Sequence, residues 1–283
     1  MSLFKPRVPL APLEYTKRLW MRAWVGLVLF FLYAPLLTLI AFSFNDSRRG
    51  NVVWRGFTFD YYEKALNNES LMIAMGNSLT IALISTIVSV VIGALAAVML
   101  WRFRFPGKTA TEGAMALPIV VPEICMGVAM LVFFAKIGFP TDLPWPFSLG
   151  AIIIAHITFC FPFVTMVVRS RLTSFNREEE EAAKDLGATE WQAFRDVLLP
   201  HMKPGLVAGA LLAFTLSLDD FVITFFTSGP NTITFPVKVY SMVRFSVTPE
   251  VNAASALLIA LTVILTTIAL KVQSRMGGTP QGH

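Results

Sequence analysis

Long apolar runs alternate with short polar segments along the whole chain. A helix needs about 20 mostly apolar residues to cross the hydrocarbon layer of a bilayer. Six runs meet that length, at roughly 23–44, 75–100, 114–138, 147–168, 204–227 and 251–270. No polar segment between them is long enough to form a second domain. The pattern therefore predicts an all-α integral membrane protein with six transmembrane helices and a single transmembrane domain, 1–283.

Composition excludes the other broad classes of protein. Of the 283 residues, 55% are hydrophobic and 14% are charged, whereas a soluble domain carries roughly 25% charged residues. The two cysteines, Cys125 and Cys160, lie inside apolar runs, so we expect neither a disulfide framework nor a metal cluster. The net charge is +5, but the basic residues flank apolar runs and form no continuous stripe that would indicate a nucleic-acid partner.

The distribution of Lys and Arg predicts how the spans are oriented. Six spans place both termini on one side of the membrane. If that side is the cytoplasm, the inner segments hold sixteen of these residues and the outer segments six, which is the bias of inner-membrane proteins. The first run follows Lys5, Arg7 and Lys17, as a signal peptide would. It is too long for one, so we expect an uncleaved anchor.

The polar segment between the fourth and fifth runs, about 174–203, predicts a helix, a turn and a second helix. Asn176 suits the N-cap position, acidic residues follow it, and Gly187 provides the left-handed residue that ends a helix. The Thr189–Gln192 segment has the spacing of a capping box, and Pro200 is expected to end the second helix. Because the segment is too charged to enter lipid, we expect it to be a structured cytoplasmic element.

This segment resembles the EAA loop of ATP-binding-cassette (ABC) importer permeases, whose pattern is E-A-A-x3-G-x9-I-x-L-P. The matching residues are Glu181, Ala182, Ala183, Gly187, Val197, Leu199 and Pro200. Val197 replaces the usual isoleucine and keeps a β-branched side chain. The resemblance implies the type I ABC importer permease fold, with this loop as the coupling loop whose first helix sits in a groove of the ATPase subunit.

Nearly the whole chain resembles the permease subunits of bacterial putrescine and spermidine importers. The similar segments are Leu117–Gly127, His156–Val164, Ala213–Pro230 and Thr248–Ala253. The resemblance implies a complex in the bacterial inner membrane, formed with a second permease subunit as a heterodimer, two cytoplasmic ABC ATPases and a periplasmic substrate-binding protein. The chain has no P-loop pattern. We therefore expect that ATP is hydrolysed on another subunit, and that this chain is not an enzyme and needs no cofactor.

Three carboxylates interrupt the apolar runs: Glu123, Asp219 and Asp220. A charged side chain at the centre of a span costs about 2.5 to 3.5 kcal/mol, so these residues are candidates for a polar substrate pathway. Pro118 and Pro122 are expected to break the third span beside Glu123. If Asp219 and Asp220 lie on one helix, they are about 100° apart and cannot point the same way.

A polyamine is an extended polycation, and separated carboxylates along a wet path can replace part of its hydration. We expect at least one of the two aspartates to face that path, whereas the other caps a helix or pairs with Arg244, His156 or the partner subunit. Several phenylalanines could add cation–π contacts: Phe159, Phe161, Phe221, Phe225 and Phe226. His156 and Cys160 share a helical face, but two ligands do not make a metal site, and a packed, hydrogen-bonded imidazole is the simpler interpretation.

Three alternative functions stay open on the sequence. The chain could be an importer permease for another small solute, although intramembrane carboxylates disfavour anions. It could be a proton-coupled secondary transporter, in which such acids are also expected. It could also be a membrane scaffold that transports nothing.

Overall fold

The computed structural model describes residues 19–47, 53–140, 143–245 and 248–276. The basic residues Lys5, Arg7 and Lys17, which entered the orientation argument, lie outside these ranges. The chain divides into two compact units. The first comprises Met1–Ala65 and Ser246–Ala256, and the second comprises Leu66–Phe245 and Leu257–His283.

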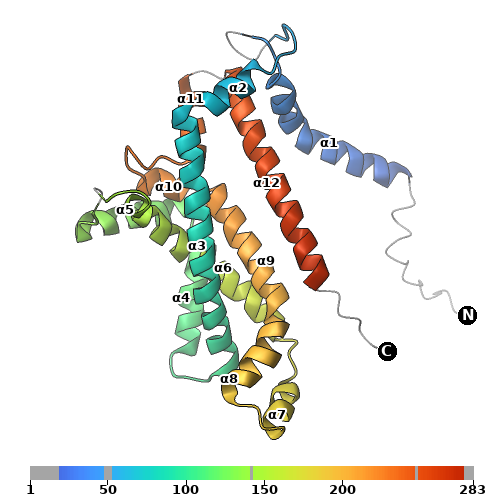
Figure 1. Cartoon of the computed structure of the whole chain (residues 1–283), viewed down its shortest axis with the longest axis vertical. Helices are drawn as coiled ribbons and strands as arrows, with labels where there is room; N and C mark the ends of the chain where they lie inside the picture. Colours follow the sequence, from blue (N-terminus) through green and yellow to red (C-terminus); the bar gives the residue numbers. More distant parts are fainter. Residues whose placement is uncertain (1–18, 48–52, 141–142, 246–247, 277–283) are drawn as a thin grey trace, which may run out of the picture. The chain divides into compact units, whose positions relative to one another are not determined.

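The described residues are almost entirely helical (Figure 1). The elements are α1 (Leu19–Phe42), α2 (Asp60–Asn67), α3 (Glu69–Arg102), α4 (Lys108–Val120), α5 (Glu123–Ile137), the short turn η2 (Phe147–Leu149), α6 (Gly150–Leu172), α7 (Arg177–Asp185), α8 (Glu190–Ala193), the π-helical turn η3 (Phe194–Leu198), α9 (Leu199–Leu218), α10 (Val222–Thr227), α11 (Phe235–Phe245) and α12 (Pro249–Met276). Within the described ranges the only β pairing is an isolated bridge between Asn45 and Phe57. The all-α prediction is confirmed.

The first unit contains a folded piece of the loop after the first span. The Asn45 side chain donates to the carbonyl of Val53 at 2.9 Å and accepts from the backbone N–H of Arg55 at 2.8 Å. The Phe44 ring stacks on Phe57, with centroids 5.2 Å apart, and lies 5.0 Å from the Tyr62 ring. These ring contacts tie the irregular segment to the start of α2, although Phe57 itself is 64% exposed.

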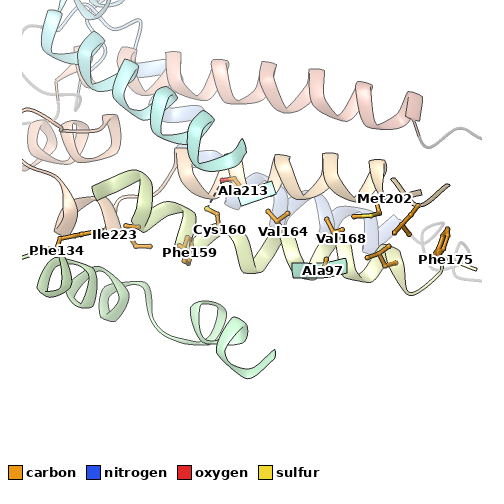
Figure 2. Close-up of a cluster of buried hydrophobic side chains, with 13 residues drawn as sticks. Ala97, Phe134, Phe159, Cys160, Val164, Val168, Phe175, Met202, Ala213 and Ile223 are labelled. Atoms are coloured by element: carbon orange, nitrogen blue, oxygen red, sulfur yellow. Dashed lines mark hydrogen bonds between the residues drawn. The ribbon is translucent and has the colours of Figure 1, made fainter. Parts of the chain in front are cut away.

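The second unit is built on α3, α6 and α9, which pack closely because small residues line their contacts. A Cβ atom added at Gly93 of α3 would lie 2.8 Å from the Val164 side chain of α6, and one added at Gly209 of α9 would lie 3.0 Å from the same side chain. Figure 2 shows the buried row that runs along this contact, with Cys160, Val164 and Val168 on α6 and Met202 and Ala213 on α9. Without water between helices, such close van der Waals packing is a main source of association.

The structure confirms most of the predicted spans, including the break in the third, and corrects the bounds of the fifth. Within the described residues, five helices are long and apolar enough to cross a membrane. The third predicted span is the pair α4 and α5, which meet at a bend of 107°. This is the break expected beside Pro118 and Pro122: Pro118 lies in the last turn of α4, and Pro122 takes the N-cap position of α5.

The fifth span begins and ends earlier than predicted. It runs from Glu190 to Leu218, so Pro200 does not end the second helix of the charged segment. The π-helical turn Phe194–Leu198 explains the continuity, because it directly precedes Leu199 and Pro200 and widens the path so that the proline ring is accommodated. The apolar run from Val222 to Thr227 is a separate helix, α10.

Candidate functional site

The charged segment 174–203 contains the predicted helix, turn and helix. The Asn176 side chain caps α7 by accepting from the N–H of Glu178 at 3.1 Å. Gly187 has φ +92°, and the N–H of Ala188 donates to the carbonyl of Ala183, which is the hydrogen-bond pattern of a left-handed C-cap. The Thr189–Gln192 capping box then starts α8. We call α7, this turn and α8 the hairpin.

The residues that match the EAA pattern fall into an exposed half and a packed half. Glu181, Ala182 and Gly187 are exposed, and the neighbouring Leu186 side chain is 90% exposed. Ala183 is half-buried. Val197 and Leu199 are also half-buried, with Val197 packed against the main core cluster, whereas Pro200 is exposed. The turn therefore presents small and apolar groups outward, while the start of the fifth span anchors the hairpin.

A four-residue charge network attaches the hairpin to the end of α3. The Glu180 carboxylate lies 2.9 Å from the Arg102 guanidinium and 3.1 Å from the Lys184 ammonium. Glu190 completes the network, 2.7 Å from Lys184 and 3.3 Å from Arg102. The hydrogen bond to Glu190, followed by the one to Glu180, raises the pKa of Lys184 above its ordinary value. Figure 1 shows the hairpin at this end of α3.

A second attachment lies beside the first. The Arg177 guanidinium stacks over the Trp101 ring, 4.6 Å from its centroid, and also donates to the Trp101 carbonyl at 3.3 Å. The Trp101 ring in turn meets Phe175 edge to face, with centroids 5.8 Å apart. The residues on α3 were missed by the sequence analysis, because nothing local to Arg102 or Trp101 marks them as partners of a distant loop. The one sequence signal for this network is the i, i+4 spacing of Glu180 and Lys184, which favours an ion pair on a helix.

Glu123 lies at the break between α4 and α5. It is the first residue of α5 and its side chain is exposed. A Cβ added at Gly127, one turn further on, would lie 2.7 Å from the Phe226 ring of α10. The Phe226 ring and the backbone of Val222 therefore pack directly against α5, so α5, which begins at Glu123, is in contact with α10, which follows the break at Asp219.

The two aspartates do not share a helix, which corrects the expectation that they lie 100° apart on one. Asp219 is the C-cap residue of α9, and Asp220 follows it in the short break before α10. Asp219 is exposed, whereas the Asp220 side chain is 3% exposed. The backbone change at the break turns one carboxylate outward and the other into the protein.

Asp220 is held by hydrogen bonds inside the second unit. Its Oδ2 accepts from the backbone N–H and the hydroxyl of Thr224, each at 2.8 Å, and its Oδ1 accepts from the N–H of Ile223 at 3.3 Å. Its Oδ2 also lies 3.3 Å from Nε2 of His156. Of the alternative partners considered from the sequence, His156 is therefore the one that Asp220 contacts.

His156 is a packed, hydrogen-bonded imidazole. Both ring nitrogens have partners, since Nδ1 lies 2.7 Å from the Ser217 hydroxyl and Nε2 lies 2.9 Å from the Thr224 hydroxyl. The Cys160 thiol points elsewhere, toward the carbonyl of Ala213. The interpretation of His156 as a packing residue is confirmed.

The phenylalanines considered for cation–π contacts have different surroundings. Phe159 is buried in the main core and packs on Phe163. Phe161 is half-buried. Near the break after α9, Phe225 is 49% exposed and Phe221 lies against Tyr240, with ring centroids 4.8 Å apart. Of these five phenylalanines, Phe221, Phe225 and Phe226 lie on the short segment that follows the exposed Asp219.

Comparison with known proteins identifies similar chains. The family model described as "binding-protein-dependent transport system inner membrane component" matches residues 89–276. The spermidine/putrescine transport system permease protein PotC of Escherichia coli (strain K12) is 42% identical over 235 residues, which cover 83% of this chain and 86% of PotC. The putrescine transport system permease protein PotI of the same organism is 41% identical over 248 residues, 87% of each chain.

A solved structure has the same fold. It is the crystal structure of a bacterial ABC transporter involved in the import of the acidic polysaccharide alginate, which matches with a TM-score of 0.72 at 18% identity. The match covers 93% of this chain and 97% of that one. At this identity the likeness concerns the fold alone.

Proposed function

The chain belongs to the family of binding-protein-dependent transport system inner membrane components, and from this premise we propose that it is the transmembrane subunit of an ATP-driven importer for polyamines, putrescine or spermidine. It lies in the bacterial inner membrane as a multi-pass protein, and the whole chain, 1–283, acts as one permease domain. The observation that carries the substrate class is the pair of exposed carboxylates, Glu123 and Asp219, at the helix breaks before α5 and before α10, two helices that pack on each other, in a chain that is 42% identical to PotC and 41% identical to PotI.

The two carboxylates suit a permeating polyamine. Each can accept charge-assisted hydrogen bonds from a primary or secondary ammonium group and so replace part of its hydration. Because they lie on different helices, they can hold successive amines without enclosing the molecule, which keeps the site weak enough for release. The exposed Phe225 ring adds an aromatic face beside them. Asp220 serves a different purpose, since its oxygens already accept from the protein.

The proposal includes the partners that this function requires. A second permease subunit completes the pathway as a heterodimer, a periplasmic binding protein delivers the substrate, and two cytoplasmic ATPases drive the cycle. Both termini and the hairpin face the cytoplasm, in accordance with the Lys and Arg distribution. The exposed surface of Glu181, Ala182 and Gly187 docks in a groove of one ATPase.

Motion of the docked hairpin reaches the spans by two routes. The charge network around Glu180 and Arg102 passes it to α3, and the uninterrupted helix from Glu190 to Leu218 passes it to the break at Asp219. Closure of the ATPases thereby switches the substrate pathway between outward and inward openings. In this scheme the fifth span connects the docking turn at one end with the pathway carboxylate at the other.

The test is uptake by a Glu123→Gln, Asp219→Asn double variant. In cells that lack their own copy of this subunit, we expect the initial rate of radiolabelled putrescine and spermidine uptake to fall by about tenfold or more, since two charge-assisted contacts are lost. The amount of the variant in the membrane should not change. The control is Glu63→Gln, which removes an exposed carboxylate of α2. Wild-type uptake by the double variant would refute the assignment.

A second measurement tests the energy source. Uptake should be inhibited by vanadate, and the subunit should co-purify with an ATPase. Uptake that follows an imposed proton gradient and ignores vanadate would instead identify a secondary transporter. No uptake of any solute by the reconstituted complex would identify a scaffold.

A further inference from the structure

The break between α9 and α10 is surrounded by a buried polar network that joins four helices. Its members are Ser85 of α3, His156 of α6, Ser217 of α9, Asp220 in the break and Thr224 of α10. Their exposed fractions range from 0 to 8%. An unsatisfied polar group at such a position is costly. Because these hydrogen bonds must stay formed, the network constrains how the four helices can move.

The contacts define part of the hydrogen bonding around the imidazole. The Thr224 hydroxyl has one proton, and it is directed at Oδ2 of Asp220, 2.8 Å away. The Thr224 oxygen must then accept, so the imidazole donates from Nε2. On the other side of the ring, Nδ1 lies 2.7 Å from the Ser217 hydroxyl, which in turn lies 3.0 Å from the Ser85 hydroxyl. The imidazole thus links the serine hydroxyls of α3 and α9 to the carboxylate.

Asp219 lies between two anchored members of this chain. Ser217 precedes it by two residues and is held by His156, and Asp220 follows it directly and is held by His156 and Thr224. The Asp219 N–H closes the last turn of α9 on the carbonyl of Thr215. Since Ser217 and Asp220 are both in contact with the same imidazole, the backbone of Asp219 between them is held in place, which fixes the direction in which its side chain leaves the backbone.

We propose that His156, acting through Asp220 and Ser217, is the positioning residue that fixes the α9–α10 break and aims the Asp219 carboxylate at the permeating cation. The role of Asp219 itself rests on the proposed function. The positioning role of His156 does not, because it concerns where residue 219 lies and can be measured without transport.

The first experiment compares two replacements of the same side chain. The amide of Gln reaches the place of Nε2, whereas the amide of Asn reaches only the place of Nδ1. His156→Gln therefore keeps the contacts to Asp220 and Thr224, and His156→Asn keeps only the one to Ser217. We expect uptake per copy in the membrane to fall by about tenfold in His156→Asn and to be largely retained in His156→Gln. Equal, wild-type uptake by both variants would overturn the proposal.

The second experiment reads the position of residue 219 directly. Asp219→Cys is made together with Cys125→Ser, which removes the exposed cysteine, while Cys160 stays because it is fully buried. A membrane-impermeant cationic methanethiosulfonate reagent then labels the full-length chain in the assembled complex. In this background His156→Asn should change the labelling rate severalfold. With His156→Gln in its place, the rate should be close to that of the chain that keeps His156. An unchanged rate in the Asn variant contradicts the positioning role.

Two further variants keep the outcome unambiguous. Thr158→Val is the control, since Thr158 lies on the same helix and its hydroxyl donates to the carbonyl of Ile154 within that helix; it should leave both uptake and labelling unchanged. If His156→Asn does not accumulate in the membrane, Ser217→Ala replaces it as the milder change, and unaltered labelling there overturns the proposal. Normal uptake by Asp219→Asn together with altered labelling would refute the substrate pathway and retain the positioning role.

Discussion

The hairpin and the α9–α10 break are both held by polar networks, but they lie in opposite environments. In the hairpin, the side chains of Glu190 and Lys184 are 75% and 30% exposed, and the bonds are ion pairs. At the break, His156 is 2% exposed and the bonds lead to a buried carboxylate. Water and salt screen the first set of interactions. Neither reaches the second, so its bonds cannot be exchanged for bonds to solvent.

This difference fits two mechanical roles. A network of ion pairs in which Lys184 and Glu190 reach solvent can exchange its bonds for bonds to water around the buried Glu180, as is needed where a surface must dock and release a partner. A buried network whose members bond only to one another and to the backbone around them holds one geometry, as is needed where a carboxylate must keep its direction while helices move around it. The hairpin is thus suited to adapt, and the break to stay rigid.

Gly187 is the one position in the hairpin where we expect a substitution to have a large effect, and this effect is the largest that we predict. At φ +92°, a β-branched side chain on residue 187 clashes with its own backbone. We expect Gly187→Val to lower transport by about tenfold or more, and to abolish substrate-stimulated ATPase activity, while the protein still inserts. Reconstituted proteoliposomes provide both measurements.

The matched control is Gly187→Asn, because asparagine adopts the left-handed conformation far more readily. It should retain most of the activity. Full coupling in Gly187→Val would show that the turn does not transmit force. Equal loss in both variants would show that the glycine is needed for close approach of a partner, and not for its backbone angle.

The sequence was sufficient for the features that local chemistry determines. The Asn176 cap, the left-handed Gly187 and the Thr189–Gln192 box each depend on residues within one turn of helix, so their patterns can be read directly. The break beside Pro122 was predicted for the same reason. The apolar runs were long enough to indicate the spans, although not the ends of the fifth.

The remaining features depend on partners far apart in the chain. Arg102 and Glu190 are 88 residues apart, and no pattern links them. The break after Leu218 contains neither Gly nor Pro; it forms because Asp220 can cap α10 and reach His156 at once. An aspartate inside an apolar run, three and four residues before the N–H groups it accepts from, is the signal that could have indicated a cap there. No sequence pattern indicates the π-helical turn before Pro200.

The close contact between α3 and α6, two of the helices that carry the buried network, should respond strongly to added volume, with the next largest effect. A Cβ at Gly93 would lie 2.8 Å from Val164, so Gly93→Ala forces α3 and α6 apart. We expect a loss of stability of about 1–3 kcal/mol, measured as a lower melting temperature of the purified protein in detergent. Gly76→Ala on the same helix is the control, since nothing lies within 4 Å of its Cβ. Equal melting temperatures for the two variants would contradict this account of the interface.

The smallest effect is expected where the hairpin joins α3. Arg102→Gln removes two ion pairs, but Glu180 keeps its bond to Lys184, so no buried charge is left alone. The melting temperature should fall by about 2 °C or less. The difference from the wild type should disappear at about 1 M salt, where the screening length is about 3 Å. A loss as large as that of Gly93→Ala, or one that salt does not reduce, would mean that the hairpin network is as rigid as the buried one, and the contrast between the two regions would fail.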